Sequence, residues 1–134
     1  METKQVIVWR KDLRNMEGHK VRTGKVAAQL AHASLKAILD KGELDENLSI
    51  MHIPMTPEMK DWVLGRFTKV CVSVNSEEEL MSVYNQAVNE GVSCSLVLDV
   101  GLTEFGGNPT FTCCAIGPAV VEDVDKITGK LSLL

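Results

Sequence analysis

A lysine lies where a helix is predicted to begin. Residues 24–40 are rich in alanine, leucine and lysine and contain no proline, which predicts a helix with Lys25 in its first turn. A helix start presents free N–H groups and a partial positive charge, and a lysine there adds a full one. The corner formed by Gly24 and Lys25 could therefore hold a phosphate or a developing oxyanion. It is not a Walker-type phosphate loop, because Val26 stands where that motif has serine or threonine.

Four polar side chains of this predicted helix share one narrow face. Lys25, Gln29, His32 and Lys36 are separated by four, three and four residues. At about 100° per residue, this spacing keeps them within a stripe of about 60°. A solvated polar face is the simpler interpretation, and a stripe that lines a cleft is the alternative.

A second polar group follows a predicted buried strand at residues 95–98. Asp99 and Thr103 come directly after it in the segment DVGLT, residues 99–103. Because α/β folds bind ligands at the carboxyl ends of strands, these two side chains could line a crevice. The alternative is that Asp99 caps a turn while Thr103 satisfies backbone groups.

Covalent and metal-dependent schemes have little support in the sequence. There is no Gly-x-Ser-x-Gly nucleophile elbow, and the cysteines and histidines lack the pattern of a catalytic pair. The three histidines, at positions 19, 32 and 52, are too scattered for zinc ligands, so we predict no metal site. The four cysteines, at positions 71, 94, 113 and 114, are predicted to be reduced residues in or near the core.

The elements that position these residues alternate between strand and helix. Strands are expected at residues 5–9, 69–74, 95–98 and 110–116, helices at 24–40, 57–65, 77–90 and 119–126, and a surface loop at 41–55. Thr23 is expected to cap the first helix, and Gly117 and Pro118 to end the last strand. This order predicts an α/β fold. We expect a single domain over residues 1–134, a three-layer α/β/α arrangement with helices on both faces of a small mixed sheet.

Length, composition and charge are compatible with an enzyme that acts on RNA. The chain has 134 residues, 45% of them hydrophobic, and no apolar run approaches the length of about 20 residues that spans a bilayer. We therefore expect a cytoplasmic protein without a membrane partner. The net charge is −4, but residues 1–25 hold seven basic and three acidic residues, so the rest carries −8. A localised basic patch is one interpretation, and a solvated basic loop is the other.

Several motifs in the chain occur in the same order in one known family. They are VIVWRKDL at residues 6–13, GKVAAQLAHA at 24–33, DVGLT at 99–103, and the closing segments AIGPA at 115–119 and DKITGKL at 125–131. Together they resemble the second class of peptidyl-tRNA hydrolases, the type typical of archaea and eukaryotes. The resemblance covers nearly the whole chain, and the helix motif is its most specific part.

This resemblance implies an activity, a set of partners and a set of residues. The activity is hydrolysis of the ester between a peptide, or an N-blocked amino acid, and the 3′ ribose of tRNA, which recycles tRNA for translation. The enzyme would be a monomer or homodimer with a mixed sheet of four strands, without a metal or organic cofactor. By position, the catalytic residues would be Lys25, Asp99, Thr103 and Thr112. The residues expected to bind substrate are Gly24, Gln29, His32, Arg10, Arg14, Lys20 and Arg22.

The implied mechanism leaves two roles open for the aspartate. Lys25 would stabilise the negative charge on the ester carbonyl oxygen, while Asp99 would either position and deprotonate the attacking water or orient the lysine. Thr103 would orient water or substrate.

The chain departs from the family pattern at three places. Leu102 replaces an arginine, the loop at residues 14–23 is longer and more basic, which could bring it to the acceptor stem, and the turn at 104–109 is longer by one residue. Two alternatives to the hydrolase therefore stay open. One is a non-catalytic module of the same fold that binds tRNA or a protein, and the other is an esterase that acts on another aminoacyl ester.

Overall fold

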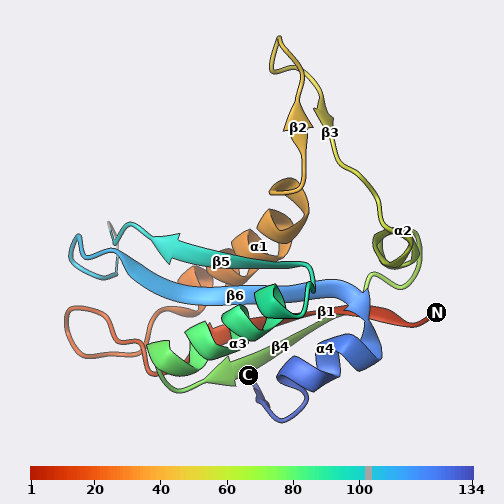
Figure 1. Cartoon of the computed structure of the whole chain (residues 1–134). Coiled ribbons are helices and arrows are strands. Elements are labelled where there is room, and N and C mark those ends of the chain that lie inside the picture. Colours follow the sequence, from red (N-terminus) through yellow and green to blue (C-terminus); the bar gives the residue numbers. More distant parts are fainter. Residues whose placement is uncertain (102–103) are drawn as a thin grey trace.

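Strand β1 (Thr3–Arg10) runs through the sheet of the computed structural model, which describes residues 1–101 and 104–134 (Figure 1). The strand order is β5-β6-β1-β4-β7, with β1 parallel to β4 and antiparallel to β6, and β5 antiparallel to β6. The carboxyl ends of β1, β4 and β5 therefore lie at the same edge of the sheet. The other strands of this sheet are β5 (Cys94–Asp99), β6 (Thr110–Val120), β4 (Lys69–Val74) and β7 (Ser132–Leu133).

Helices pack against both faces of this sheet. Val6 and Val8 of β1 belong to a core cluster with residues of α3 (Glu77–Asn89) and α4 (Val121–Thr128). Ile7 and Trp9 belong to a second cluster with residues of α1 (Thr23–Leu39). Because successive side chains of a strand point to opposite faces, a strand covered on both sides is apolar at every position, as the run at residues 6–9 is.

Two helices begin at the residues that the sequence predicts, directly after a capping side chain. Helix α2 (Pro57–Leu64) begins after Thr56, whose hydroxyl accepts the N–H of Met59 at 3.1 Å. Helix α3 begins after Ser76, whose hydroxyl accepts the N–H of Glu79 at 3.1 Å. The four cysteines are free thiols, in or near the core as expected.

The predicted cap of α1 is wrong by one residue. Thr23 is the first helical residue, and Arg22 precedes the helix, where its side chain makes no capping hydrogen bond. The backbone carbonyl of Arg22 accepts the N–H of Val26 at 3.0 Å. The guanidinium of Arg22 donates a hydrogen bond to the carboxylate of Glu104. No side chain therefore caps the start of α1 in the described part of the chain.

The sheet has five strands, so the expectation of four is wrong. The additional strand, β7, has two residues and pairs with the edge of β4. A strand this short has no alternation that could reveal it in the sequence.

The end predicted for β6 is also wrong, because the strand continues through Gly117 and Pro118 to Val120. The pairing of β1 with β6 shifts at this point, and a bulge tolerates a proline without a ladder N–H. Gly117 has φ +99°, and a Cβ there would lie 2.6 Å from the carbonyl oxygen of Lys4. The last helix consequently begins at Val121 and not at residue 119.

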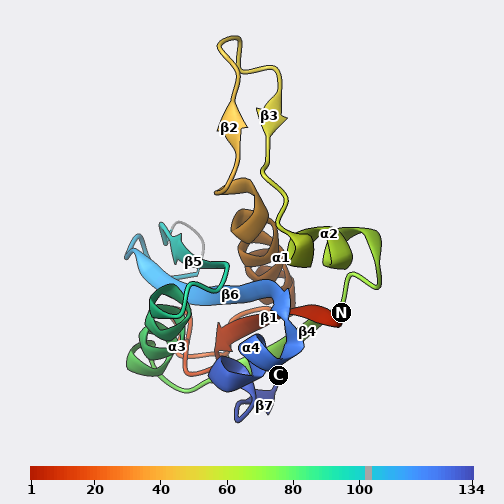
Figure 2. The same ribbon diagram turned by 45° about the vertical axis from the view of Figure 1, so that its right-hand side comes forward.

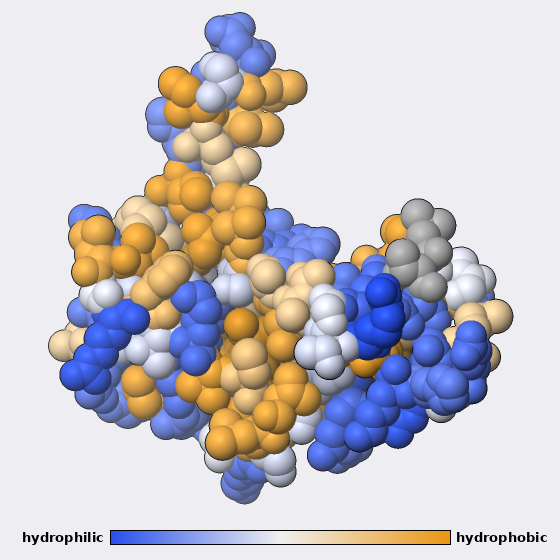
Figure 3. Space-filling model, turned by 180° about the vertical axis from the view of Figure 1, so that it is seen from behind, coloured by the Kyte–Doolittle hydropathy of each residue, from blue (hydrophilic) through white to orange (hydrophobic). Residues whose placement is uncertain are grey.

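The segment predicted as a surface loop contains a β-hairpin that projects from the body (Figures 1 and 2). Strands β2 (Glu43–Leu44) and β3 (Met51–His52) have two residues each and pair antiparallel. Hydrophobic side chains are exposed along it, and the hydrophobic surface continues onto the body of the molecule (Figure 3). In the described residues, no helix is long and apolar enough to cross a membrane.

Candidate active site

A largely buried ion pair joins the start of α1 to the end of β5. Lys25 Nζ donates a hydrogen bond to Asp99 Oδ1 at 2.9 Å, and the two side chains are only 14% and 10% exposed. Lys25 is in the first turn of α1, and Asp99 is the last residue of β5. The pair therefore lies at the carboxyl edge of the sheet, where α/β proteins bind ligands.

The second oxygen of Asp99 is fixed by the turn that follows the strand. Asp99 Oδ2 accepts the backbone N–H of Gly101 at 3.1 Å. Gly101 has φ +85°, and a Cβ there would lie 2.4 Å from the carbonyl oxygen of Asn108, so this turn requires glycine. With both oxygens engaged, the carboxylate holds the ammonium in one place. An ammonium has three donors, and those not used by Asp99 can stabilise an anion.

A hydrogen-bonded pair of neutral side chains lies one helical turn along α1. Thr112 Oγ1 donates to Gln29 Oε1 at 2.5 Å, and Thr112 is 0% exposed. The Cys113 thiol donates to the backbone carbonyl of Gln29 at 3.3 Å, and burial raises the pKa of that thiol to about 12, so it stays neutral. Gln29 follows Lys25 by four residues, so both side chains point from α1 toward the sheet.

The other half of the predicted polar stripe lies elsewhere. His32 and Lys36 line a separate hollow of about 430 Å³ with Leu35, Leu39 and Asp40. Lys36 Nζ lies 2.6 Å from Asp40, which is an ordinary surface pair of one helix. The structure therefore brings Gln29 to the side of Lys25 and leaves His32 apart.

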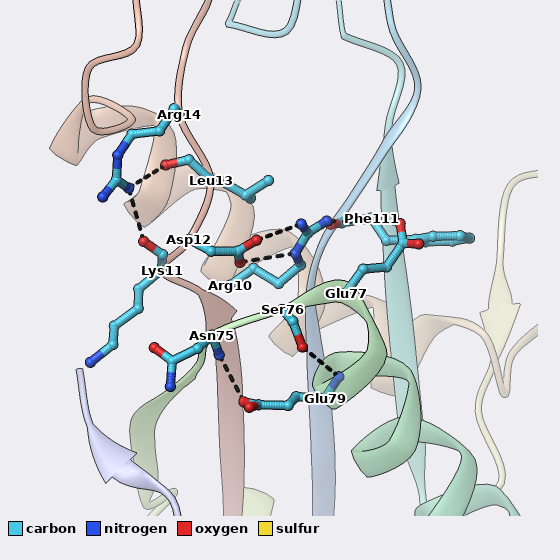
Figure 4. Close-up of polar contacts among 10 residues, drawn as sticks. All are labelled: Arg10, Lys11, Asp12, Leu13, Arg14, Asn75, Ser76, Glu77, Glu79 and Phe111. Carbon is cyan, nitrogen blue, oxygen red and sulfur yellow. Dashed lines mark hydrogen bonds and ion pairs between the residues drawn. The ribbon is translucent and has the colours of Figure 1, made fainter.

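Arg10 is surrounded by protein partners. Its guanidinium makes two hydrogen bonds to Asp12, at 3.2 and 2.8 Å, and one to the carbonyl of Phe111 at 3.0 Å (Figure 4). Glu77 lies 3.8 Å away on the other side. Four nearby acceptor atoms leave this side chain little capacity for substrate.

Arg14 differs from Arg10 because backbone carbonyls hold it. Its Nη1 donates to the carbonyls of Lys11 and Leu13, at 3.1 and 2.9 Å (Figure 4). Arg14 and Lys20 line a cavity beside the start of α1.

Glu104 is a site residue that sequence reasoning missed. It is buried, and Arg22 donates to it across 82 positions of sequence. A partner so distant in the chain leaves no local pattern, although its place directly after residues 99–103 was a weak signal. Thr103, predicted as catalytic, and Leu102 lie outside the described residues. In the described part of the chain, no three His, Cys, Asp or Glu side chains form a group suited to a metal ion.

Comparisons of the sequence with known proteins match one family over nearly the whole chain. The family model described as "Peptidyl-tRNA hydrolase PTH2" matches residues 3–134. The chain is 39% identical over 130 residues to the peptidyl-tRNA hydrolase of Haloquadratum walsbyi, covering 97% of this chain and 98% of that protein. It is 38% identical over 131 residues to the one from Methanocaldococcus jannaschii, covering 98% and 99%. It is 37% identical over 134 residues to the one from Sulfurisphaera tokodaii, covering 100% of both.

A solved structure is similar in fold. A protein of unknown function from Agrobacterium tumefaciens aligns with a TM-score of 0.55 at 15% identity, covering 100% of this chain and 98% of that one. At this identity, the similarity concerns the fold alone.

Proposed function

Because the chain belongs to the peptidyl-tRNA hydrolase PTH2 family and is a hydrolase that cleaves the ester of peptidyl-tRNA, we propose that Lys25 and Asp99 form its catalytic centre. The observation that carries the proposal is their largely buried ion pair, with 2.9 Å between Nζ and Oδ1, at the junction of a helix start and a strand end. We further propose that N-blocked aminoacyl esters of tRNA are substrates and that the activity recycles tRNA.

Lys25 is the group that stabilises the transition state in this proposal. Attack of water on the ester carbonyl moves negative charge onto the carbonyl oxygen, and the ammonium and the uncapped start of α1 both favour that charge. Such a preorganised donor contributes about 10²- to 10³-fold to kcat. The ammonium is already held by Asp99, so little reorganisation is needed when the charge develops.

Asp99 is a positioning residue in this proposal. One of its oxygens holds Lys25 and the other holds the N–H of Gly101, which supports the orienting role over that of a general base. Its remaining lone pairs can still accept a hydrogen bond from the attacking water. We propose that Thr103 orients this water or the substrate.

Thr112 and Gln29 form a hydrogen-bonded pair beside the centre, one turn of α1 from Lys25. Because Thr112 is enclosed and donates to Gln29, we propose that it fixes the Gln29 side chain next to Lys25 and does not itself touch substrate. Gly24 would leave the helix start open, since nothing lies within 4 Å of a Cβ built there. Arg14, Lys20 and Arg22 are the basic residues that we propose near RNA. The contacts of Arg10 support a structural role, and the place of His32 supports no role at this centre.

The test is release of N-blocked aminoacyl or peptidyl groups from tRNA by the purified protein in excess EDTA. We expect turnover by the wild type and losses of at least about 10²-fold in kcat for Lys25→Ala and for Asp99→Asn. Lys36→Ala is the matched control, because it removes a lysine of the same helix that is also paired with an aspartate, but at the surface.

The outcomes separate the parts of the proposal. Full activity in Lys25→Ala, with its fold checked by circular dichroism, would overturn the assigned centre. Loss of turnover in EDTA would contradict a mechanism without a metal ion. An equal loss in Lys36→Ala would show that the effect is not specific to the buried pair.

Three further properties are proposals of the same kind. The family match over residues 3–134 supports one domain, and the substrate supports a cytoplasmic location because tRNA is used there. A homodimer is the remaining proposal, and light scattering on the purified protein distinguishes it from a monomer.

A further inference from the structure

A cavity of about 650 Å³ opens beside the start of α1, between the loop after β1 and the end of β4. Its volume is in the range of small-molecule sites. Its wall is apolar, formed by Trp9, Leu13, Val21, Val26 and Leu134. Trp9 is only 4% exposed, so the wall offers apolar contact and not an open stacking platform. The cavity therefore suits a mostly apolar group of limited size.

The rim of this cavity is basic. Lys11, Arg14 and Lys20 line it. In Figure 4, the side chains of Lys11 and Arg14 extend to the side away from the pair of Arg10 and Asp12. Asp12 also lines the cavity, but its carboxylate is paired with the Arg10 guanidinium, whose positive charge offsets it. Among the charged side chains of the described lining, positive charge is therefore in excess, which favours an anionic ligand.

The cavity and the proposed catalytic centre both lie at the start of α1 and at the carboxyl edge of the sheet. Thr23 and Val26 of α1 line it, whereas the side chains of Lys25 and Asp99 do not. The start of the helix is uncapped by side chains, and Gly24 presents no side chain that would separate the cavity from Lys25. A ligand bound in the cavity would therefore have to extend past the start of α1 to bring a neighbouring group to the Lys25–Asp99 pair.

We propose that this cavity binds the 3′-terminal nucleotide of tRNA, with the base against the apolar wall and its 5′-phosphate against the basic rim. The proposal rests on the function above, because the ester to be cleaved is attached to the ribose of that nucleotide. Asn75, which also lines the cavity, offers an amide donor and acceptor to the edge of the base. A peptide side chain would explain the apolar wall but not the three cations, and a groove for RNA backbone alone would not need an apolar hollow.

The test uses Trp9 as a reporter of the cavity. The chain has two tryptophans, and Trp62 is enclosed in α2 beside Phe67, with ring centroids 4.3 Å apart. In Trp62→Phe, Trp9 is the only tryptophan, so its emission reports on ligands in the cavity. We expect a saturable change with adenosine 5′-monophosphate, and at least about tenfold weaker binding of adenosine or inorganic phosphate alone. The same titration of the unchanged protein, with Trp9→Phe as its control, serves if Trp62→Phe does not fold.

The role of the rim is tested by removing cations in pairs. Lys11→Ala with Lys20→Ala should weaken binding of the nucleotide at least about tenfold, and should raise KM for peptidyl-tRNA by a similar factor while kcat stays near the wild-type value. Lys41→Ala with Lys60→Ala removes two exposed lysines that do not line this cavity and should change neither quantity.

Three results would overturn the inference. They are no change in Trp9 emission up to millimolar nucleotide, equal binding of phosphate and nucleotide, and an unchanged KM in the Lys11 and Lys20 double variant. Binding of nucleotide by a protein that does not hydrolyse peptidyl-tRNA would be a different failure. In that case the proposed function falls, and with it the assignment to the tRNA end, while the nucleotide site itself persists.

Discussion

A double-mutant cycle on Lys25 and Asp99 tests whether the two residues act as one unit. If Asp99 works by holding the ammonium, removing either residue removes the same stabilisation, typically about 10²- to 10³-fold in kcat, or about 2.7–4 kcal/mol. The double variant should then lose no more than about the worse single variant. If Asp99 acted separately as a general base on water, the losses would multiply to about 10⁴- to 10⁶-fold.

The assay is single-turnover hydrolysis of peptidyl-tRNA by the wild type, Lys25→Ala, Asp99→Asn and the double variant at one pH. Multiplicative losses would refute the positioning role of Asp99. Urea unfolding of the same four proteins supplies a second readout. Lys25→Ala leaves a carboxylate that is 10% exposed with the N–H of Gly101 as its described partner, which should cost about 1–3 kcal/mol. The surface variant Lys36→Ala should cost about 0–1 kcal/mol.

Two further predictions concern buried residues of β6. Thr112→Val removes the donor of a fully enclosed side chain and leaves the Gln29 amide oxygen without it, so the free energy of unfolding should fall by about 1–3 kcal/mol in urea titrations, while Thr112→Ser should recover most of it. Burial raises the pKa of Cys113 from 9.0 to about 12 and that of Cys114 well above 9.0, so between these values the folded state binds more protons than the unfolded state. Their contribution to stability is therefore full below pH 9 and is lost as pH rises toward 12, with a slope of up to about 1.4 kcal/mol per pH unit for each thiol, measured by unfolding between pH 8 and 10.5.

Both predictions have a contradicting result. Equal stability of Thr112→Val and Thr112→Ser would show that the hydroxyl is not needed by Gln29. For the thiols, the control is the variant with Cys113→Ala and Cys114→Ala, whose unfolding free energy should depend less on pH in the alkaline range. The same slope in both proteins would assign the alkaline loss to other groups.

The sequence by itself was sufficient for the elements whose signals are local. The run at residues 6–9, the alternation at 69–74 and the alanine-rich segment with Lys25 predicted β1, β4 and α1 within one or two residues at each end. These signals depend on side-chain size, backbone preference and capping, all of which act within a few neighbouring residues. The motifs were also sufficient for the family, because all of them occur in the family's order along the chain.

The errors in the fold arose where pairing with a distant strand overrides local preference. Gly117 and Pro118 looked like the end of a strand, but a bulge against β1 keeps them inside β6. Strand β7 is defined by its pairing with the edge of β4, and the hairpin of β2 and β3 has strands of two residues each. None of these features has a sequence pattern long enough to predict it.

The candidate site was decided by tertiary structure. Nothing within a few residues of Lys25 indicates that Asp99, 74 positions away, will meet its ammonium, and Gln29 and Thr112 are 83 positions apart. The sequence also could not separate Gln29 from His32, which share a predicted stripe but face different surroundings. Helical spacing fixes which side chains share a direction, whereas the order of strands and the packing of α1 across them decide what each side chain meets. The residue types were therefore present in the sequence, and their partnerships were set only when the sheet brought distant segments together.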